Sequence, residues 1–391
     1  MKSFEISVEF SVDSHYPVAF TDDAFATYNP LLADILRRDG TPGAGVRRIR
    51  VFLDAGLVNA QPDLPDRILA YGKAHAPQMG AEAPAIYPGG EQIKNERDHV
   101  DRIVRDLAER RLCRHSIVLA VGGGAFLDAV GFAAALVHRG VRLVRIPTTT
   151  LSQDDSGVGT KNGINAAGQK NFLGTFMPPW AVINDFTLLR TLTKELVLDG
   201  VAEAFKVAII RDRTFFEALC AHAAELADPT GDALRTCVRR SAELHAEHIM
   251  TAGDPFEMGA ARPLDFGHWA AHRLETLSNY RIRHGQAVSI GIALDACYAE
   301  SMGLVSAADR DAIHTGLRTA GLPLYNPLLE REDPDGRLAI LTGIEQFREH
   351  LGGQLAVTFP NPIGHRIELN EVEEQRVHDA IRHLRAPNTA G

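Results

Sequence analysis

One stretch of the sequence constrains the fold more than any other. Residues 115–150 read HSIVLAVGGGAFLDAVGFAAALVHRGVRLVRIPTTT. A short apolar run ends in three glycines, a small-residue helical pattern follows, and a second apolar run comes after it. Two such runs joined by a helical crossover predict neighbouring parallel strands with a helix packed on them. A ligand site of such a sheet is expected at the carboxyl ends of its strands.

The same alternation occurs upstream and stops near the middle of the chain. Strand-like runs at 49–56 and 83–91 alternate with helical patterns at 65–76 and 96–112. From about residue 194 helical periodicity dominates. We therefore predict an α/β domain with a Rossmann-like parallel sheet over residues 1–193 and a mostly α-helical domain over residues 194–391. We also predict an added N-terminal hairpin over residues 2–20 and a late hairpin over residues 354–369.

Composition excludes several classes of protein. The formal net charge of the 391 residues is −9, whereas a general nucleic-acid binder needs a basic face. The sequence has no run of eighteen apolar residues, so no membrane span is expected. The first residues alternate polar and apolar types, unlike the continuous apolar core of a signal peptide. We expect a cytoplasmic protein that acts on a small molecule.

The glycine turn at residues 122–124 lies between a predicted strand and a predicted helix. Glycines there let backbone N–H groups approach a pyrophosphate at a helix N-terminus, although three glycines can also be only a tight turn. Asp128 near the helix start and Asp54 at a strand end favour a dinucleotide. Asp128 can reach the nicotinamide or a ribose, and Asp54 suits an adenosine ribose hydroxyl. Glu91 and Lys94 follow a Gly-Gly pair, a pattern also typical of a solvated turn.

A polar segment over residues 145–176 is the most informative part of the chain. It contains five glycines and no pattern that predicts a helix. A loop of this length is uncommon in a compact domain unless it has a function. Lys161 and Lys170, with Arg139 before the preceding strand, suit an anionic phosphate or carboxylate better than a plain surface loop.

Three histidines, His268, His272 and His284, fall within seventeen residues. The first two are four apart and share a face if the segment is helical. A single histidine is most often half-buried without a function, so the histidines alone do not decide the chemistry.

The ordered motifs resemble the 3-dehydroquinate synthase family, the sugar phosphate cyclases. The resemblance runs from about residue 50 to 305, with weaker similarity to 360. Its motifs are GGGAFLDAVGFAAALVHRG, IPTTTLSQDDSGVGTKNGIN, GQKNFLGTF, DGVAEAFK, FGHWAAHRLE and RHGQAVSIG.

The resemblance implies a divalent metal, zinc in most members and cobalt in some, held by Glu203, His268 and His284. The residue types agree, because one carboxylate and two imidazoles leave coordination positions open for substrate oxygens. Glu203 also lies on an apolar helix face, where an unpaired carboxylate is costly. The resemblance further implies an NAD+ pocket, whose expected residues are Asp54, Glu91, Lys94, Gly123, Gly124, Asp128, Thr148, Thr149 and Thr191.

The resemblance also implies the reaction and the residues that carry it. A phosphorylated keto-sugar is transiently oxidised by NAD+, loses phosphate, is reduced again and closes to a carbocycle by an aldol addition, as in a carbon–oxygen lyase acting on phosphates. Members of the family are homodimers. Catalytic roles fall on Lys206, His272, Lys161 and Asp155, and substrate contacts on Arg139, Lys170, Asn171, Arg262, Asp265 and His350.

Departures from the synthase pattern bear on the substrate. Asp265 stands where an asparagine is usual, His350 replaces a lysine, and Glu247 or His248 replaces another. These changes remove positive charge from the place expected to bind the substrate carboxylate, and an acid there weakens carboxylate binding. A keto-sugar phosphate without a carboxylate, such as sedoheptulose 7-phosphate, fits better than the sugar acid used by 3-dehydroquinate synthase.

Two other functions share parts of this pattern. An iron- or zinc-dependent alcohol or glycerol dehydrogenase has the same architecture, but it releases NADH and usually uses Asp as the first metal ligand. A non-catalytic sugar-phosphate or NAD sensor would not need an open metal site. Glu203 and the lysines favour the cyclase.

Overall fold

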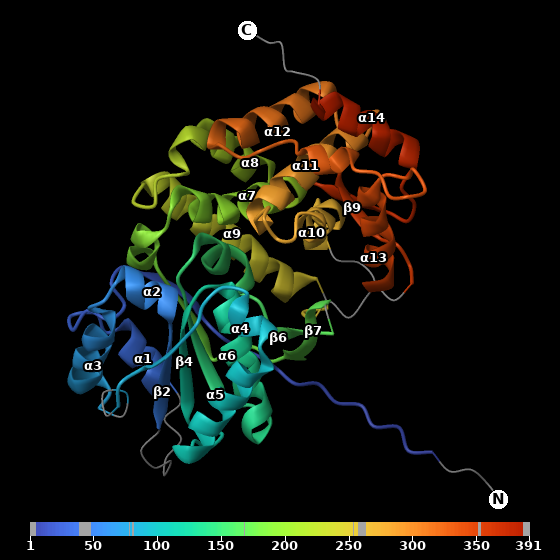
Figure 1. Cartoon of the computed structure of the whole chain (residues 1–391). Coiled ribbons are helices and arrows are strands. Elements are labelled where there is room, and N and C mark those ends of the chain that lie inside the picture. Colours follow the sequence, from blue (N-terminus) through green and yellow to red (C-terminus); the bar gives the residue numbers. More distant parts are fainter. Residues whose placement is uncertain are drawn as a thin grey trace, which may run out of the picture.

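The computed structural model describes residues 5–38, 48–77, 79, 82–167, 169–252, 254–256, 263–350 and 353–385. An α/β half built on one sheet lies next to a helical half. In Figure 1 the α/β half is at the bottom and the helical half at the top. The predicted architecture is confirmed. No helix in the described ranges combines the length and the apolar character needed to cross a bilayer.

The central sheet has six parallel strands in the order β1-β8-β5-β4-β2-β3. The chain steps outward from β2 to β3 at one edge, and from β4 through β5 to β8 in the opposite direction. The strand order therefore reverses between β2 and β4, and a ligand crevice is expected there. The strands are β1 (Val18–Thr21), β2 (Ile49–Asp54), β3 (Ala85–Tyr87), β4 (Ile117–Gly122), β5 (Arg142–Pro147) and β8 (Ala181–Asp185).

Helices cover both faces of this sheet, which explains why its strands read as continuous apolar runs. In β4, Leu119 and Val121 face the core beneath α1 and α3, while Val118 and Ala120 face the core beneath α5 and α6. All four side chains are fully buried. The helices of this half are α1 (Leu31–Arg37), α2 (Ala55–Ala60), α3 (Leu64–His75), α4 (Gln92–Asn95), α5 (Arg97–Glu109) and α6 (Gly124–Leu136).

The second half is a layered helical core around α7 and α11. Both helices are buried along most of their length, because they pack against each other and are covered on other sides by α9, α10 and α14. The helices are α7 (Lys194–Arg211), α8 (Arg213–Ala221), α9 (Asp232–Thr251), α10 (His268–Leu277), α11 (His284–Ser301), α12 (Ala307–Ala320), α13 (Thr342–His350) and α14 (Glu374–Arg385).

Two predicted hairpins have different outcomes. The late hairpin is confirmed, because β9 (Val357–Pro360) pairs antiparallel with β10 (Arg366–Leu369). The N-terminal hairpin is wrong. Residues 5–17 form no strand, and Val18–Thr21 alone pair in parallel with β8. The alternating pattern of the N-terminal residues indicates an extended chain, but it cannot say whether a pairing partner lies within the same chain.

The polar segment expected to be a loop is more ordered than its composition suggests. After β5, residues Ser152–Ser156 form a short π-helical turn, η2. Two antiparallel strands, β6 (Lys161–Ala166) and β7 (Gln169–Phe176), then form a ribbon beside α6. Fully buried Arg145 explains this order, because its guanidinium donates to the carbonyls of Gly157, Gly159 and Lys161.

Candidate active site

The carboxyl ends of β2 and β4 meet around Asp54. The Asp54 carboxylate caps α2 by accepting from the Gly56 N–H at 2.7 Å. A Cβ atom at Gly89 would collide with the Asp54 carboxylate. A Cβ atom at Gly122 would lie 2.9 Å from the Cβ atom of Asp54. Both positions therefore require glycine for space. The glycine turn then leads into α6, with Gly123 as its N-cap and Gly124 as its first residue.

Several residues expected in a cofactor pocket lie together at this edge. Buried Lys94 donates from Nζ to the Asp128 carboxylate at 2.8 Å and also contacts the Asn171 side chain. Glu91 accepts a hydrogen bond from Asn165 of β6 at 3.0 Å. The ribbon of β6 and β7 is thus bound to the pocket through α4.

Not every expected cofactor residue joins this group. Thr148 follows β5, and its N–H donates to the Gly122 carbonyl, so it lies beside the glycine turn. Thr149 exchanges hydrogen bonds with Ser152 of η2. Thr191 is exposed at the end of the 3-10 helix η3 (Phe186–Thr191), where it contacts the Leu188 carbonyl at 3.5 Å.

Arg139 lies away from the other expected substrate contacts. It is exposed in the 3-10 turn η1 (Val137–Arg139), after α6 and before the amino end of β5. The 13 residues of α6 span roughly 20 Å, so Arg139 lies near the edge of the sheet opposite the glycine turn. The sequence placed it correctly before a strand but did not indicate at which edge.

Glu203, His268 and His284 converge from three different helices. Glu203 lies in the buried middle of α7, and the two histidines are the first residues of α10 and α11. Their potential ligand atoms lie within 4.8 Å of one another. Glu203 Oε1 is 3.0 Å from His284 Nε2 and 3.5 Å from His268 Nε2.

The histidine orientations fit a cation. Nδ1 of His268 donates to the Phe266 carbonyl at 3.1 Å, and Nδ1 of His284 faces Glu275 at 3.6 Å. Each Nε2 is therefore left to face the carboxylate of Glu203, which is only 1% exposed. Metal-binding histidines typically hold their second nitrogen in this way, so the donor set suits a divalent metal with open positions.

Lys206 lies one turn after Glu203 and forms an ion pair with it. Burial lowers the pKa of Lys206, but the charges of Glu203 and Asp155 raise it by more, so the lysine remains protonated. The charge of Asp265, which ends the 3-10 turn η5 (Pro263–Asp265) just before α10, also contributes to this rise. The triad is thus flanked by a buried cation.

Asp155 projects from η2 toward the helical half. Its carboxylate lies 2.9 Å from Nδ1 of His245 on α9. Burial raises the pKa of Asp155, while Lys206 and His245 lower it by more, and the net direction is downward. Glu247 or His248 was expected to stand on this helix where the family has a lysine. Instead His245 meets Asp155, while Glu247 pairs with Arg240.

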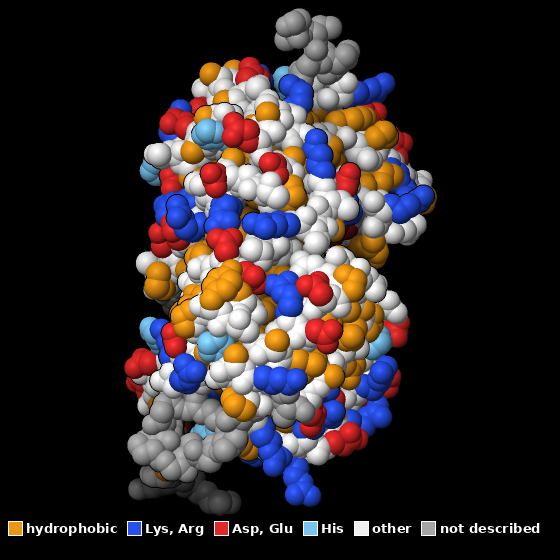
Figure 2. Space-filling view, turned by 90° about the vertical axis from the view of Figure 1, so that its left-hand side faces the viewer, with side chains coloured by type: hydrophobic (Ala, Val, Ile, Leu, Met, Phe, Trp, Pro, Cys, Tyr) orange, Lys and Arg blue, Asp and Glu red, His pale blue; other side chains and the backbone are white. Residues whose placement is uncertain are grey.

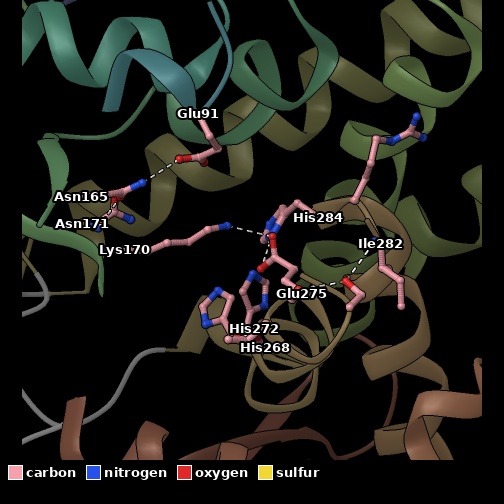
Figure 3. Close-up of polar contacts among 12 residues, drawn as sticks. Glu91, Asn165, Lys170, Asn171, His268, His272, Glu275, Ile282 and His284 are labelled. Carbon is pink, nitrogen blue, oxygen red and sulfur yellow. Dashed lines mark hydrogen bonds and ion pairs between the residues drawn. The ribbon is translucent and has the colours of Figure 1, made fainter. Parts of the chain in front are cut away.

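Lys170 of β7 reaches across to α10. Its ammonium group is 2.9 Å from Oε1 of Glu275 and 5.0 Å from the ring centre of Tyr280. Figure 3 shows Lys170 pointing toward Glu275, with the rings of His268, His272 and His284 around that carboxylate. His272 is exposed, and its ring centre is 6.1 Å from that of His284.

Glu275 and His245 are the two site residues that the sequence did not indicate. Glu275 is 4% exposed and binds Lys170 through one oxygen while its other oxygen faces His284. Its position seven residues after His268 places it two helical turns away on the same face. Lys161 begins β6. Arg262 and the side chain of His350 lie outside the described residues.

A second group of possible ligands comes from α11, α12 and α14 of the helical half. It consists of Cys297, His314 and His383. The ring of His314 donates from Nε2 to the Ala293 carbonyl at 3.1 Å, and burial raises the pKa of Cys297 to about 12. The neutral thiol that this burial favours, and the hydrogen bond that occupies Nε2 of His314, make this group less suited to a cation than Glu203, His268 and His284.

Comparison with known proteins identifies the family. A model of the 3-dehydroquinate synthase N-terminal region matches residues 85–199, and a model of its C-terminal region matches residues 200–338. The chain belongs to the 3-dehydroquinate synthase family.

Several relatives have names that include different products. The chain is 36% identical over 315 residues to a 2-epi-5-epi-valiolone synthase from Streptomyces glaucescens, covering 80% of this chain and 77% of the relative. It is 35% identical over 313 residues to a 3-dehydroquinate synthase from a Nitratiruptor species, covering 77% and 84%. The family is therefore that of the sugar phosphate cyclases, and identity alone does not separate these substrates.

Solved structures agree with this assignment. A 2-epi-5-epi-valiolone synthase from Streptomyces hygroscopicus subsp. jinggangensis 5008, with NAD+ and Zn2+ bound, superposes with a TM-score of 0.82 at 27% identity, over 97% of this chain and 99% of that one. A probable glycerol dehydrogenase from Sinorhizobium meliloti 1021 has a TM-score of 0.61 at 18% identity over 95% and 96%. The dehydrogenases are thus distant relatives in fold alone.

Proposed function

We propose that this member of the family is a lyase that eliminates phosphate from a phosphorylated keto-sugar and closes the product to a carbocycle. The observation that carries the proposal is the convergence of Glu203, His268 and His284 beside a buried, protonated lysine. NAD+ would supply reversible hydride transfer, and a divalent metal, zinc or cobalt, would hold and acidify substrate hydroxyls.

Separate groups of residues would bind NAD+ and the metal. The glycine turn and the N-terminus of α6 would receive the pyrophosphate of NAD+, because backbone N–H groups point outward there. Asp54 is placed for a ribose hydroxyl, and the Lys94–Asp128 pair lies at the adjoining edge. Glu203, His268 and His284 would hold the metal through Oε1 and the two Nε2 atoms.

Lys206 and Asp155 would act on the substrate next to the metal. The protonated ammonium of Lys206 would stabilise negative charge that develops on a substrate oxygen. Asp155 stays ionised and so can accept a proton or a hydroxyl hydrogen bond. His272 is exposed one turn from His268 and would contact the substrate, and Lys161 and Asn171 on the ribbon would contribute polar contacts to the phosphate.

The substrate we propose is a keto-sugar phosphate without a carboxylate, of the size of sedoheptulose 7-phosphate. Asp265 supports this proposal, because it stands three residues before His268 and its charge contributes to the raised pKa of Lys206. An acid at that place repels a substrate carboxylate and accepts hydrogen bonds from sugar hydroxyls.

Phosphate release tests this proposal directly. The metal-loaded protein with NAD+ is mixed with sedoheptulose 7-phosphate or with the sugar-acid phosphate used by 3-dehydroquinate synthase, and inorganic phosphate is followed. We expect kcat/KM to be at least tenfold higher for sedoheptulose 7-phosphate, which lacks the carboxylate. The Asp265→Asn variant should narrow that ratio, and a preference of the wild-type protein for the sugar acid would contradict the proposal.

The same assay separates the other functions. A cyclase returns its hydride in each turnover, so absorbance of NADH stays flat while phosphate accumulates. Steady accumulation of NADH with a polyol, without phosphate release, would indicate a dehydrogenase. A protein that neither retains a divalent metal nor turns over any sugar phosphate would instead be a sensor.

A further inference from the structure

The ring of His284 faces a carboxylate with each of its two nitrogens. Nε2 lies 3.0 Å from Oε1 of Glu203, and Nδ1 lies 3.6 Å from Oε2 of Glu275. The metal proposed above uses only the Nε2 side of this ring. The Nδ1 side is therefore another place where an imidazole meets a carboxylate, and it lies outside the ligand set Glu203, His268 and His284.

His272 completes a group of possible ligands on the Nδ1 side. One ligand atom from each of His272, Glu275 and His284 lies within 4.8 Å of the other two. His272 and Glu275 are three residues apart on α10, so they share one face of that helix. Imidazole nitrogens and carboxylate oxygens are donors that zinc binds in proteins. These three residues are called the His272 site below.

The state of the Glu275 carboxylate indicates a ligand at this site. Within the described residues, its buried Oε2 accepts no hydrogen bond, because the 3.6 Å to Nδ1 of His284 is too long for one. A buried carboxylate oxygen without a donor is costly, and a bound cation removes that cost. The ring of His272 is exposed, so a cation can enter the site from solvent.

An ammonium group already lies at the same carboxylate. Lys170 donates from Nζ to Oε1 of Glu275 at 2.9 Å, and it also lies 5.0 Å from the ring centre of Tyr280. Figure 3 shows Lys170 reaching Glu275 from the ribbon, with the rings of His272 and His284 close to that carboxylate. Two cations at one carboxylate repel each other, so a divalent ion would have to displace Lys170.

We propose that His272, Glu275 and His284 form an additional divalent-cation site, suited to zinc, for which Lys170 is the built-in competitor. The site shares His284 with the metal proposed above, and one imidazole binds two cations only after both of its ring nitrogens have lost their protons. Filling both sites therefore releases the proton of Nδ1 to solvent. For this reason the His272 site should be the weaker of the two.

Zinc stoichiometry measured without substrate tests the site. Metal-free protein is dialysed against zinc at a series of buffered free concentrations, and the zinc bound per chain is counted. The wild-type protein should bind one equivalent tightly and another at least tenfold more weakly. The His272→Gln variant should keep the tight equivalent and lose the weak one, with an unchanged thermal unfolding midpoint.

The matched control for this variant is His222→Gln. His222 also precedes a glutamate, Glu225, by three residues and lies 3.3 Å from it, but the pair is exposed and remote from the metal ligands in sequence. This variant should bind both equivalents like the wild-type protein. A weak equivalent that disappears in His222→Gln and persists in His272→Gln would overturn the proposal.

Replacing Lys170 with Met should have the opposite effect on the weak equivalent. The substitution keeps the apolar stem of the side chain and removes the competing charge, so the weak equivalent should bind at least tenfold more tightly. Lys73→Met, which changes an exposed lysine of α3, should alter neither equivalent. An unchanged weak affinity in Lys170→Met, or a wild-type protein that binds a single equivalent at saturating zinc, would overturn the proposal.

A cation at the His272 site should inhibit the enzyme, because it covers His272 and takes Glu275 from Lys170. This consequence rests on the proposed function, whereas the site itself does not. Phosphate release should fall in proportion to the occupancy of the weak equivalent, and a constant rate while that equivalent fills would overturn the inhibitory role. Failure of the proposed function is distinguishable, since no phosphate would then be released at any zinc concentration.

Discussion

At the scale of single residues, Glu275 connects the two halves of the protein. It accepts from Lys170 of the ribbon at 2.9 Å and faces Nδ1 of His284 at 3.6 Å. Burial raises the pKa of Glu275, but His284 and Lys170 lower it by a larger amount. The pKa is about 2, so the carboxylate stays charged at neutral pH. A carboxylate in this place fixes the ring of a metal ligand and increases its basicity.

Replacing Glu275 with Gln should weaken metal binding at Glu203, His268 and His284, although Glu275 is not in that ligand set. The amide keeps the size of the side chain but removes the charge opposite Nδ1 of His284. Loss of such an outer partner typically costs about 10- to 100-fold in metal affinity. Zinc affinity measured by competition with a chromogenic chelator should fall by an amount in that range.

The matched control is Glu225→Gln. Glu225 also faces a histidine, His222, at 3.3 Å, but this pair is exposed in the helical half. The zinc affinity of the Glu225→Gln variant should equal that of the wild-type protein. Equal affinities for Glu275→Gln and the wild-type protein would remove Glu275 from the metal site.

Prediction from sequence was uneven at this scale. The resemblance indicated Glu203, His268 and His284, and the structure brings them together. Glu275 is part of a quoted motif, but only the fold shows that Lys170, about a hundred residues earlier in the chain, reaches it. His245 was missed because helical periodicity does not indicate which face of α9 meets η2.

At the scale of elements, Asp295 holds the start of α10 against α11. Its two oxygens accept from the Trp269 indole at 3.0 Å and from the Gly267 N–H at 3.1 Å. Gly267 has φ of +78° and lies against the backbone of Ile292, so a side chain would not fit there. Since His268 follows directly, these contacts position a proposed metal ligand.

Asp295 should make stability depend on pH. Burial raises its pKa from 3.8 to about 8, although both hydrogen bonds lower it. A group with a raised pKa contributes stability that is fully present below pH 4 and is lost as pH rises through 8. Between these values the folded state holds a proton that the unfolded state has released, at a cost of up to about 1.4 kcal/mol per pH unit.

The Asp295→Asn variant should lack this dependence. Its amide leaves one of the two donors poorly matched, so it should be less stable than the wild-type protein at pH 5. The difference in unfolding free energy should shrink or reverse by pH 8. Only the wild-type protein loses stability as pH rises, because its buried acid must keep a proton that the unfolded state releases. Urea unfolding at both values measures the change, and a difference that stays constant would show that Asp295 ionises normally.

The spacing of apolar residues predicted most helices and strands, because apolar residues recur where an element is buried. The strands β2, β4 and β5 are buried on both faces and appear as apolar runs, and the amphipathic α5 appears as a helical pattern. The ribbon of β6 and β7 was missed, since its strands are polar and Arg145, which hydrogen-bonds Lys161 and Asn162 at the start of β6, lies in another strand. The N-terminal segment was read as a hairpin because alternation identifies a strand without identifying its partner.

At the scale of the whole molecule, one series of polar contacts spans both halves. Asp128 pairs with Lys94, Lys94 contacts Asn171, and the adjacent Lys170 pairs with Glu275 beside His284. The expected cofactor pocket and the expected metal site are therefore connected through the ribbon.

Charges of both signs are mixed on the surface of the molecule. Figure 2 shows Lys and Arg side chains interspersed with Asp and Glu over the face in view, without a large field of one sign. A small sugar phosphate needs only local positive charge.

The position of the metal tests the account most directly. Crystals grown with zinc and measured at the zinc absorption edge should give an anomalous peak about 2.0–2.2 Å from Glu203 Oε1 and from Nε2 of both His268 and His284. A peak at Cys297, His314 and His383 instead, or no peak among the first three residues at saturating zinc, would contradict it.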